Sequence, residues 1–193
     1  MLTVRSDRSG DVWFAVAENE RGEIVSSSFS LNSRREAVQS VVKSLPVCLK
    51  REIKEKKGKS SSLQMMRSLF QGKRLSKQRR LDMRFIPPFT RAVYRTARNI
   101  PRGWVTTYGI IAAKAGNRFA QRAVGNAMRR NPFTLFVPCH RVVPSTLNVG
   151  RYSLSSYPHL GSKVKRALLV GEGVDFDGKK VSRKSVWKFK SRR

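Results

Sequence analysis

Acidic side chains are the scarcest feature of this sequence. Its 193 residues include 41 lysines and arginines but only 12 aspartates and glutamates, which gives a formal net charge of +29. No acidic residue occurs between Asp82 and Glu172, and that interval holds fifteen basic residues. Because an ordinary solvated surface mixes both signs, this stretch indicates a folded domain that binds a polyanion. General solubility charge is the alternative, and no long basic amphipathic helix supports binding to an anionic membrane.

Cysteine and long apolar runs are also scarce. Two cysteines in such a chain indicate a reducing compartment rather than a disulfide framework, so we expect an intracellular protein. The first apolar run, residues 12–17, is far shorter than the roughly 20 residues of a transmembrane helix. No signal-peptide pattern precedes this run. We therefore expect no association with a membrane.

Residues 1–84 combine strand, helix and linker patterns. Two β-rich runs surround the turn-like sequence ENERG within residues 11–30, which predicts a hairpin. A helix is expected from Ser33 to about Leu45. The charged stretch 49–64 predicts an exposed linker, followed by a short helix around LQMMRSLF. The chain contains no evident internal repeat.

A second domain is expected over residues 85–193, and it begins with a helix. Thr90 is a candidate cap for this helix, and Pro101 with Gly103 should end it. The helical pattern rests on an apolar stripe, formed by Ala92, Val93, Thr96 and Ile100.

Two further short helices predict a helix-turn-helix. The first should start at a cap supplied by Thr106 or Thr107 and stop at Gly116. The second should start at Asn117 and end before Pro132. Two helices joined by a tight turn match the motif, although many helical hairpins share this pattern.

The last of these helices carries small residues at helical spacing. Ala120, Ala123 and Ala127 recur along it, and Arg122 projects between them. Gly125 costs a helix roughly 1 kcal/mol relative to alanine, which indicates close approach by a partner. Packing against another helix is one explanation. The basic surroundings favour a nucleic-acid groove.

One cysteine stands in a distinctive setting, FVPCHRVVP at residues 136–144. A free cysteine is often a buried hydrophobic residue. Its thiolate is the reactive form, and a thiol with a pKa near 8.5 is mostly protonated at neutral pH unless a histidine or a positive field lowers that pKa. The residues Cys139, His140 and Arg141 alone leave open whether the cysteine is a buried core residue or a nucleophile.

The segments RAVGNAMRRNP, VPCHRVVP, VGRYS and EGV, in this order, resemble the alkylguanine-DNA alkyltransferases. The resemblance covers roughly residues 85–174, and the first 80 residues match only in outline. It implies an N-terminal α/β domain, a small sheet plus helices, followed by a mostly helical DNA-binding domain with a helix-turn-helix. It also implies that Cys139 takes an alkyl group from the O-6 position of guanine in double-stranded DNA, irreversibly and once per molecule, without a cofactor.

The resemblance assigns roles to further residues. His140 would accept the thiol proton through a water, Glu172 would orient that histidine, and Asn131 would brace the turn that bears Cys139. Tyr108 would donate a proton to the leaving guanine. Glu172 is also the first acid after 89 acid-free residues, which suits a carboxylate that holds an imidazolium.

Each of these roles has a structural alternative. Glu172 could be a solvated helix end before a C-cap at Gly173. Asn131 could be an ordinary helix stop before Pro132, and Tyr108 could be a core aromatic.

For DNA, the resemblance implies that Arg122 enters the base stack in place of the extruded nucleotide, whose extrusion costs a few kcal/mol. Further implied DNA contacts are Ala120, Ala123, Ala127, Arg129 and Tyr108. The implied pocket for the base consists of Tyr108, Met128, Val142, Tyr152, Ser153 and Leu154.

The sequence departs from the family pattern at several positions. Arg130 replaces a common glycine, and RYSLSSYP lacks the paired glycines that usually follow the serine. Leu154 and Ser155 then occupy the loop that closes over the alkyl group, and the leucine should shrink the pocket. Zinc ligands found in some relatives are absent, since Cys48 and His159 are the only spare ligands, so we expect no metal.

Three other functions fit parts of the sequence. A non-enzymatic lesion-binding relative would have another residue in place of the cysteine, but Cys139 is present. A nucleoid or RNA-binding protein would explain the charge but would not need the cysteine motif. A cysteine hydrolase would need an oxyanion signature, which is not evident. We expect a monomer that resides in the cytoplasm with the nucleoid, or in the nucleus of a eukaryotic host.

Overall fold

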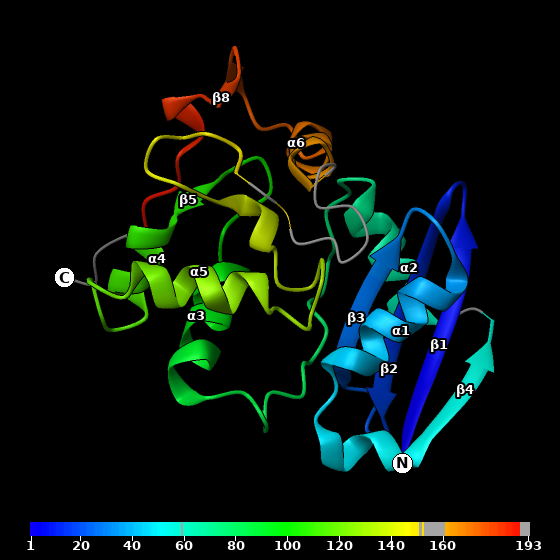
Figure 1. Ribbon diagram of the computed structural model, residues 1–193. Coiled ribbons are helices and arrows are strands. Elements are labelled where there is room, and N and C mark those ends of the chain that lie inside the picture. Colours follow the sequence, from blue (N-terminus) through cyan, green and yellow to red (C-terminus); the bar gives the residue numbers. More distant parts are fainter. Residues whose placement is uncertain (59, 151, 153–160, 190–193) are drawn as a thin grey trace. The chain divides into compact units, whose positions relative to one another are not determined.

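The chain begins with three consecutive antiparallel strands, β1 (Leu2–Ser9), β2 (Val12–Asn19) and β3 (Ile24–Ser30) (Figure 1). The computed structural model describes residues 1–58, 60–150, 152 and 161–189. Strands β2 and β3 form the predicted hairpin. In its turn, Asn19 Oδ1 accepts the amide hydrogens of Arg21 and Glu23, both at 3.0 Å. Strand β1 was not predicted.

Helix α1 (Arg34–Ser44) packs on one face of this sheet. It forms as predicted, with Ser33 Oγ accepting the Glu36 amide at 3.2 Å and the chain becoming extended at Leu45. The helix and the strands enclose one apolar core, which comprises Leu2, Val4, Ala15, Ala17, Val25, Ala37, Val38, Val41 and Leu45.

A second helix, α2 (Ser61–Phe70), begins at a Ser60 cap and contributes an aromatic cluster. The Phe70 ring lies 5.5 Å from that of Phe14 on β2 and 5.1 Å from that of Phe29 on β3. Both pairs are edge-on, the geometry that aromatic quadrupoles prefer.

The stretch 49–64 is largely exposed, as predicted, but the prediction of an irregular linker was wrong. This stretch contains part of a 3₁₀ helix, η1 (Val47–Glu52), and a strand, β4 (Ile53–Lys57), before α2 begins. Strand β4 pairs in parallel with β1 and completes the sheet order β3-β2-β1-β4. Its Ile53 packs against the α1 core, and its charged residues lie at an edge position, where charge discourages pairing with other chains. The fold is therefore an α/β domain with a small mixed sheet, as expected.

The chain divides into two units, residues 1–86 with 131–136, and residues 87–130 with 137–193. The main boundary lies two residues beyond the expected one. The segment 131–136 returns to the first unit because Pro132 accepts the Ser27 amide at 2.7 Å and Thr134 accepts the Ser27 hydroxyl at 2.9 Å.

The second unit begins with α3 (Pro88–Arg98). Pro88 occupies its first turn and no side chain caps it, so the expected Thr90 cap was wrong; proline is preset for this position because its fixed φ is helical. The buried side chains of this segment are Val93, Tyr94, Ala97 and Ile100.

Two short helices follow, α4 (Tyr108–Lys114) and α5 (Gln121–Arg129), and they pack against each other. Thr107 caps α4 as expected, with its hydroxyl accepting the Ile110 amide at 3.3 Å. Asn117 does not cap α5. Its side chain accepts the Phe119 amide within the connecting turn, and Ala120 is the N-cap residue of α5, without a side-chain hydrogen bond.

The remaining elements form the support for the cysteine. A two-residue strand, β5 (Thr106–Thr107), pairs in parallel with β6 (Val142–Val143). Helix α6 (Gly161–Gly171) follows, then the hairpin β7 (Phe176–Asp177) and β8 (Lys180–Val181), and a 3₁₀ turn, η3 (Arg183–Ser185). They share a core of Val105, Val143, Val149, Leu169, Val174 and Val181. Among the described residues, no helix has both the length and the apolar character that crossing a membrane requires.

Candidate active site

The cysteine lies in a tight turn directly before a strand. Residues Cys139–Arg141 form the 3₁₀ turn η2, in which Cys139 N donates to Val137 O at 2.8 Å and Arg141 N donates to Pro138 O at 2.9 Å. The pairing of β6 with β5 fixes the exit of this turn. Cys139 forms no disulfide and its side chain is half-buried, so a reactant can reach the sulfur.

Glu172 is located at the end of α6 and faces inward. Gly173, with φ of 83°, terminates the helix, and the Val174 amide donates back to Leu169 O at 3.0 Å in a Schellman arrangement. The expected helix end is therefore present. It is not solvated, because Glu172 is only 2% exposed.

A buried network joins this carboxylate to the cysteine turn. Glu172 Oε1 lies 2.9 Å from His140 Nε2. Arg141 binds the same carboxylate with two nitrogens, Nε to Oε2 and Nη2 to Oε1, each at 2.7 Å. Arg141 Nη1 donates further to Ile100 O at 2.8 Å. The structure thus brings together His140 and Glu172, as the sequence predicted, and adds Arg141.

Electrostatics determines the protonation of the pair. Burial would raise the pKa of Glu172, but the charges and hydrogen bonds of His140 and Arg141 outweigh it and lower this pKa to about 2. Burial lowers the pKa of His140, with the Glu172 carboxylate acting in the opposite direction. At neutral pH the carboxylate is ionised and the imidazole is neutral. An ionised carboxylate only accepts, so Nε2 carries the hydrogen and Nδ1 keeps a lone pair.

The free lone pair makes His140 a candidate base. Nδ1 is buried, and within the described part of the chain no protein atom hydrogen-bonds to it. His140 itself is 2% exposed and adjoins Cys139 in the chain. The arrangement can accept a proton from the thiol, directly or through one water.

Other polar groups surround the sulfur. Tyr152 lies near enough to Cys139 to interact with it electrostatically, and burial, followed by the negative charge of the thiolate, raises the pKa of Tyr152. The same two causes raise the pKa of Tyr108, so its phenol stays protonated at neutral pH. Lys165 is 1% exposed and donates to Val142 O at 2.7 Å. Burial lowers the pKa of Lys165 to about 8, and the thiolate opposes this shift.

The small residues of α5 do not share one exposed face. Arg122 and Ala123 are exposed, but Val124 and Ala127 are buried, and the Ala127 carbonyl accepts the Tyr94 hydroxyl at 2.9 Å. Ala127 therefore packs inside the unit, because the helix needs its own apolar stripe for the core. A Cβ at Gly125 would meet no atom within 4 Å, so internal packing does not explain this glycine.

The other predicted site residues are distributed as follows. Met128 and Val142 are buried, Arg129 and Arg130 are exposed, and Ala120 is half-buried. Asn131 belongs to the first unit, and its Oδ1 accepts the Phe133 amide at 3.0 Å, so it holds the turn after α5. Ser153, Leu154, Ser155 and His159 lie outside the described residues.

Sequence reasoning missed three residues of this site. Arg141 lies inside the cysteine motif. Lys165 lies on the apolar face of α6 with Leu168 and Leu169, and a lysine at such a position could have been recognised from the sequence as a buried, functional residue. For Gly161 the indication in the sequence was weaker. A Cβ there would lie 2.2 Å from Tyr152 O, so this glycine is needed where α6 approaches the tyrosine that interacts with the thiol.

The second unit matches a known family model. Residues 88–174 match the DNA-binding domain of 6-O-methylguanine DNA methyltransferase. The methylated-DNA--protein-cysteine methyltransferase of Methanothermobacter thermautotrophicus is 40% identical over 98 residues, which are 51% of this chain and 51% of that protein. The match thus spans about half the length of this relative. The protein of the same name from Thermococcus kodakarensis is 33% identical over 187 residues, 90% of this chain and 97% of that protein.

A solved structure resembles almost the whole chain. The O6-methylguanine-DNA methyltransferase from Pyrococcus kodakaraensis strain KOD1 aligns with a TM-score of 0.68 at 31% identity. The alignment covers 90% of this chain and 100% of that one. The likeness therefore includes the first unit, where the sequence pattern matched only in outline.

Proposed function

The chain belongs to the methylated-DNA--protein-cysteine methyltransferase family, and from this premise we propose that it repairs DNA by accepting an alkyl group from O-6-alkylguanine on Cys139. The observation that carries the proposal is the buried network of Glu172, His140 and Arg141 beside a half-buried thiol. A core cysteine would not require an ionised carboxylate and an oriented imidazole as its neighbours, since burying both has a large desolvation cost.

The chemistry balances without a cofactor. The Cys139 thiol gives its proton through a water to His140 Nδ1, and the thiolate then attacks the alkyl carbon. The new carbon–sulfur bond forms as the carbon–oxygen bond to guanine breaks, and the electron pair remains on the base. A proton supplied to the ring restores neutral guanine. The thioether is stable, so each molecule reacts once.

Neighbouring groups support both halves of this reaction. Lys165 is a buried cation close enough to the sulfur for their charges to interact, which favours the thiolate. Tyr108 keeps its proton at neutral pH and is the proposed donor to the leaving base. Tyr152, which interacts electrostatically with Cys139, would line the pocket with Met128 and Val142.

The proposed partner is duplex DNA with an alkylated guanine. Residues 87–193 carry 22 basic and three acidic side chains, a charge balance suited to a phosphate backbone. Helices α4 and α5 would act as the helix-turn-helix, with Arg122 and Ala123 exposed toward the DNA and Arg129 nearby. A base inside a duplex cannot reach a half-buried thiol unless it is extruded, and Arg122 would fill the space that it leaves.

Finer features of the site also belong to the proposal. Asn131 would brace the cysteine turn, Ser153 would contribute to the pocket for the base, and Leu154 would shrink that pocket and favour small alkyl groups. We further propose that the protein acts as a monomer without a metal or cofactor. It would act wherever chromosomal DNA lies, the nucleoid or the nucleus according to the host.

One incubation tests the function. The protein is mixed with a duplex oligonucleotide that carries O-6-methylguanine, and the intact protein mass and the repaired base are measured over time. We expect one added methyl group per protein molecule, located on Cys139 by peptide mapping, and one guanine restored for each. Retention of the oligonucleotide without a mass change would identify a lesion-binding protein. Multiple turnovers would identify a hydrolase.

A further inference from the structure

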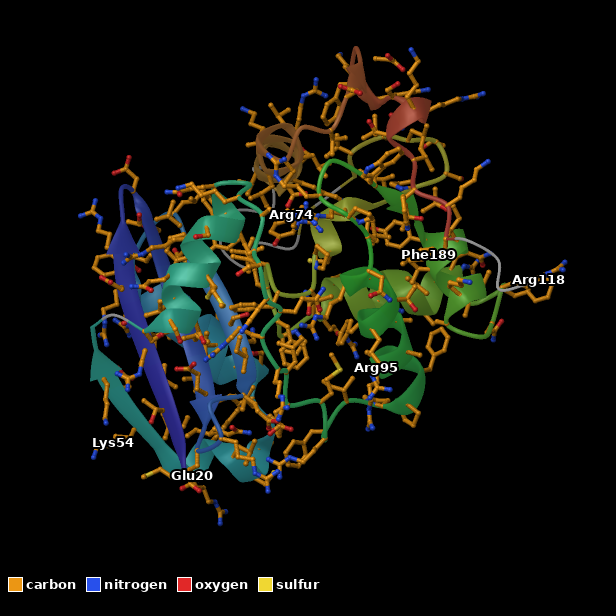
Figure 2. All side chains as sticks on the ribbon, turned by 180° about the vertical axis from the view of Figure 1, so that it is seen from behind. Glu20, Lys54, Arg74, Arg95, Arg118 and Phe189 are labelled. Carbon is orange, nitrogen blue, oxygen red and sulfur yellow. The ribbon has the colours of Figure 1, made fainter. Side chains whose placement is uncertain are left out.

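The turn between α4 and α5 presents an aromatic ring to solvent. Phe119 is 76% exposed, which makes it far more exposed than Trp104 at 37% in the same unit. Trp104 packs edge-on against Trp187 at 5.6 Å, whereas Phe119 has the Arg118 guanidinium 4.6 Å from its ring centroid. Figure 2 shows the Arg118 side chain extending outward from the ribbon. A ring so exposed adds little to the core of this unit.

The backbone holds this pair in place. Asn117 Oδ1 accepts the Phe119 amide at 3.0 Å, and Asn117 O accepts the Ala120 amide at 3.1 Å. Gln121 Nε2 donates to Arg118 O at 2.7 Å. These bonds fix the backbone of the turn, so the Phe119 ring can move only by rotation about its own side-chain bonds. A rigid aromatic loses little conformational entropy when it binds a partner.

The surroundings indicate the chemistry of that partner. Lys114 on α4 and Arg122 on α5 are exposed on either side of the turn, as is Arg118 within it. The nearest acidic residues along the chain are Asp82 and Glu172. An aromatic ring among cations matches a nucleotide, because the ring packs on a base or sugar while the cations bind phosphates.

We propose that Phe119 is an apolar DNA contact at the start of α5, packing on a base or deoxyribose face while Arg118 binds an adjacent phosphate. The inference rests on the proposed function, since it uses the same duplex that Arg122 would enter. It adds a contact that does not depend on charge. Apolar wedges of this kind are common where proteins hold a distorted duplex.

The test compares variants of Phe119 with a matched pair elsewhere in the chain. Phe85 is 48% exposed and lies under the Arg84 guanidinium at 5.8 Å, so Phe85→Ala removes a similar aromatic–arginine contact in the first unit. Dissociation constants for a duplex are measured for the full-length parent, Phe119→Ala, Phe119→Trp, Arg118→Gln and Phe85→Ala at several salt concentrations. Thermal unfolding checks that each variant is folded.

We expect Phe119→Ala to weaken duplex binding about 5- to 50-fold without changing the salt dependence, the range expected for one lost stacking contact. Phe119→Trp should retain the parent affinity. Arg118→Gln should lower the salt slope by about one, as the loss of one phosphate contact does. Phe85→Ala should bind like the parent.

Two results would overturn the inference: parent-like binding by Phe119→Ala, or an equal loss in Phe85→Ala. A separate readout isolates the proposed function. Alkylation of Cys139 by free O-6-alkylguanine needs no duplex, so it should proceed equally in the parent and in Phe119→Ala. If the parent itself fails to react, the proposed function is wrong, while the binding comparison still decides the role of Phe119.

Discussion

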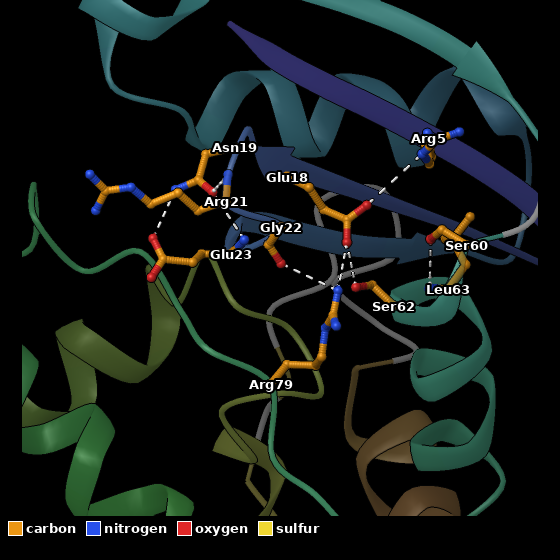
Figure 3. A network of polar contacts seen from close by, with 10 residues as sticks. All are labelled: Arg5, Glu18, Asn19, Arg21, Gly22, Glu23, Ser60, Ser62, Leu63 and Arg79. Carbon is orange, nitrogen blue, oxygen red and sulfur yellow. Dashed lines mark hydrogen bonds and ion pairs between the residues drawn. The ribbon is translucent and has the colours of Figure 1, made fainter.

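Each unit contains a carboxylate that is largely buried and bound by arginine, and the two differ in their remaining partners. In the first unit, Glu18 Oε1 accepts the Ser62 hydroxyl at 2.6 Å and Arg79 Nη2 at 3.0 Å, and Oε2 lies 4.0 Å from Arg5 Nε (Figure 3). In the second unit, Glu172 binds an arginine and a histidine. The Glu18 and Glu172 side chains are 12% and 2% exposed.

The two networks differ in whether a partner of the carboxylate can change its protonation state. A hydroxyl and a guanidinium keep their protons at ordinary pH, so the Glu18 network only joins α2 and the segment at Arg79 to strand β2. An imidazole can take up a proton, and His140 is adjacent to a thiol. In both networks an arginine donates hydrogen bonds to the carboxylate. The partner that is not an arginine, a serine hydroxyl for Glu18 and an imidazole for Glu172, decides whether the network can take up a proton.

The largest effect should come from removing the thiol while leaving both networks intact. Cys139→Ala should abolish alkyl transfer because no other group at this position can form the thioether. Binding to duplex DNA should persist, since phosphate contacts and Arg122 are unchanged. Protein mass after incubation with alkylated DNA and a binding titration provide the two measurements. Residual transfer in this variant would contradict the assignment of the nucleophile.

Matched substitutions of the two carboxylates test the comparison directly. Glu172→Gln should slow transfer from free O-6-alkylguanine about 100-fold or more, within the usual range for loss of general-base assistance. Glu18→Gln should lower thermal stability but leave the reaction rate near that of the parent. Rates are compared at pH 7 with circular dichroism as the folding control. Equal rates in the two variants would remove Glu172 from the activation of Cys139.

Arg122 offers a contrast with Arg141, which is committed to the Glu172 network. Arg122→Ala should slow repair of duplex DNA at least tenfold, because extrusion of the base costs a few kcal/mol that the side chain would offset. Reaction with the free base should stay near the parent rate, since it needs no extrusion. Equal slowing on both substrates would point to a structural role. A change confined to the salt slope would make Arg122 one phosphate contact among many.

The smallest effect concerns stability in acid. The pKa of Glu172 is lowered to about 2, so its network stabilises the fold above the ordinary carboxyl pKa, and this contribution is lost as pH falls from about 4 to 2. The shift corresponds to about 3 kcal/mol. Urea unfolding at pH 7 and pH 3 should therefore show a weaker pH dependence in Glu172→Gln than in the parent. An unchanged dependence would contradict the lowered pKa.

Much of the local structure could be predicted from the sequence, because it depends on neighbours along the chain. Thr107 caps α4 as expected, and α1 begins after Ser33 as expected, in both cases because a side-chain oxygen reaches an amide three residues ahead. The hairpin of β2 and β3 could likewise be predicted, from two β-rich runs around a turn sequence. Asn117 shows the limit of such reasoning, because the same side chain can cap a helix or close a turn, and here it closes the turn.

The sequence by itself determined the chemistry available to this protein: a thiol beside a histidine, a basic domain with three acids, and a motif order shared with one family. Only the tertiary structure decided which groups work together. In the folded chain the Glu172 carboxylate is buried at the end of α6 and paired with Arg141, and Lys165 interacts with the thiolate. Of the small residues on α5, Ala127 is buried and Ala123 is exposed. Residues 53–57, IKEKK, form a strand. These outcomes depend on burial and pairing between residues far apart in the chain, which local pattern does not encode.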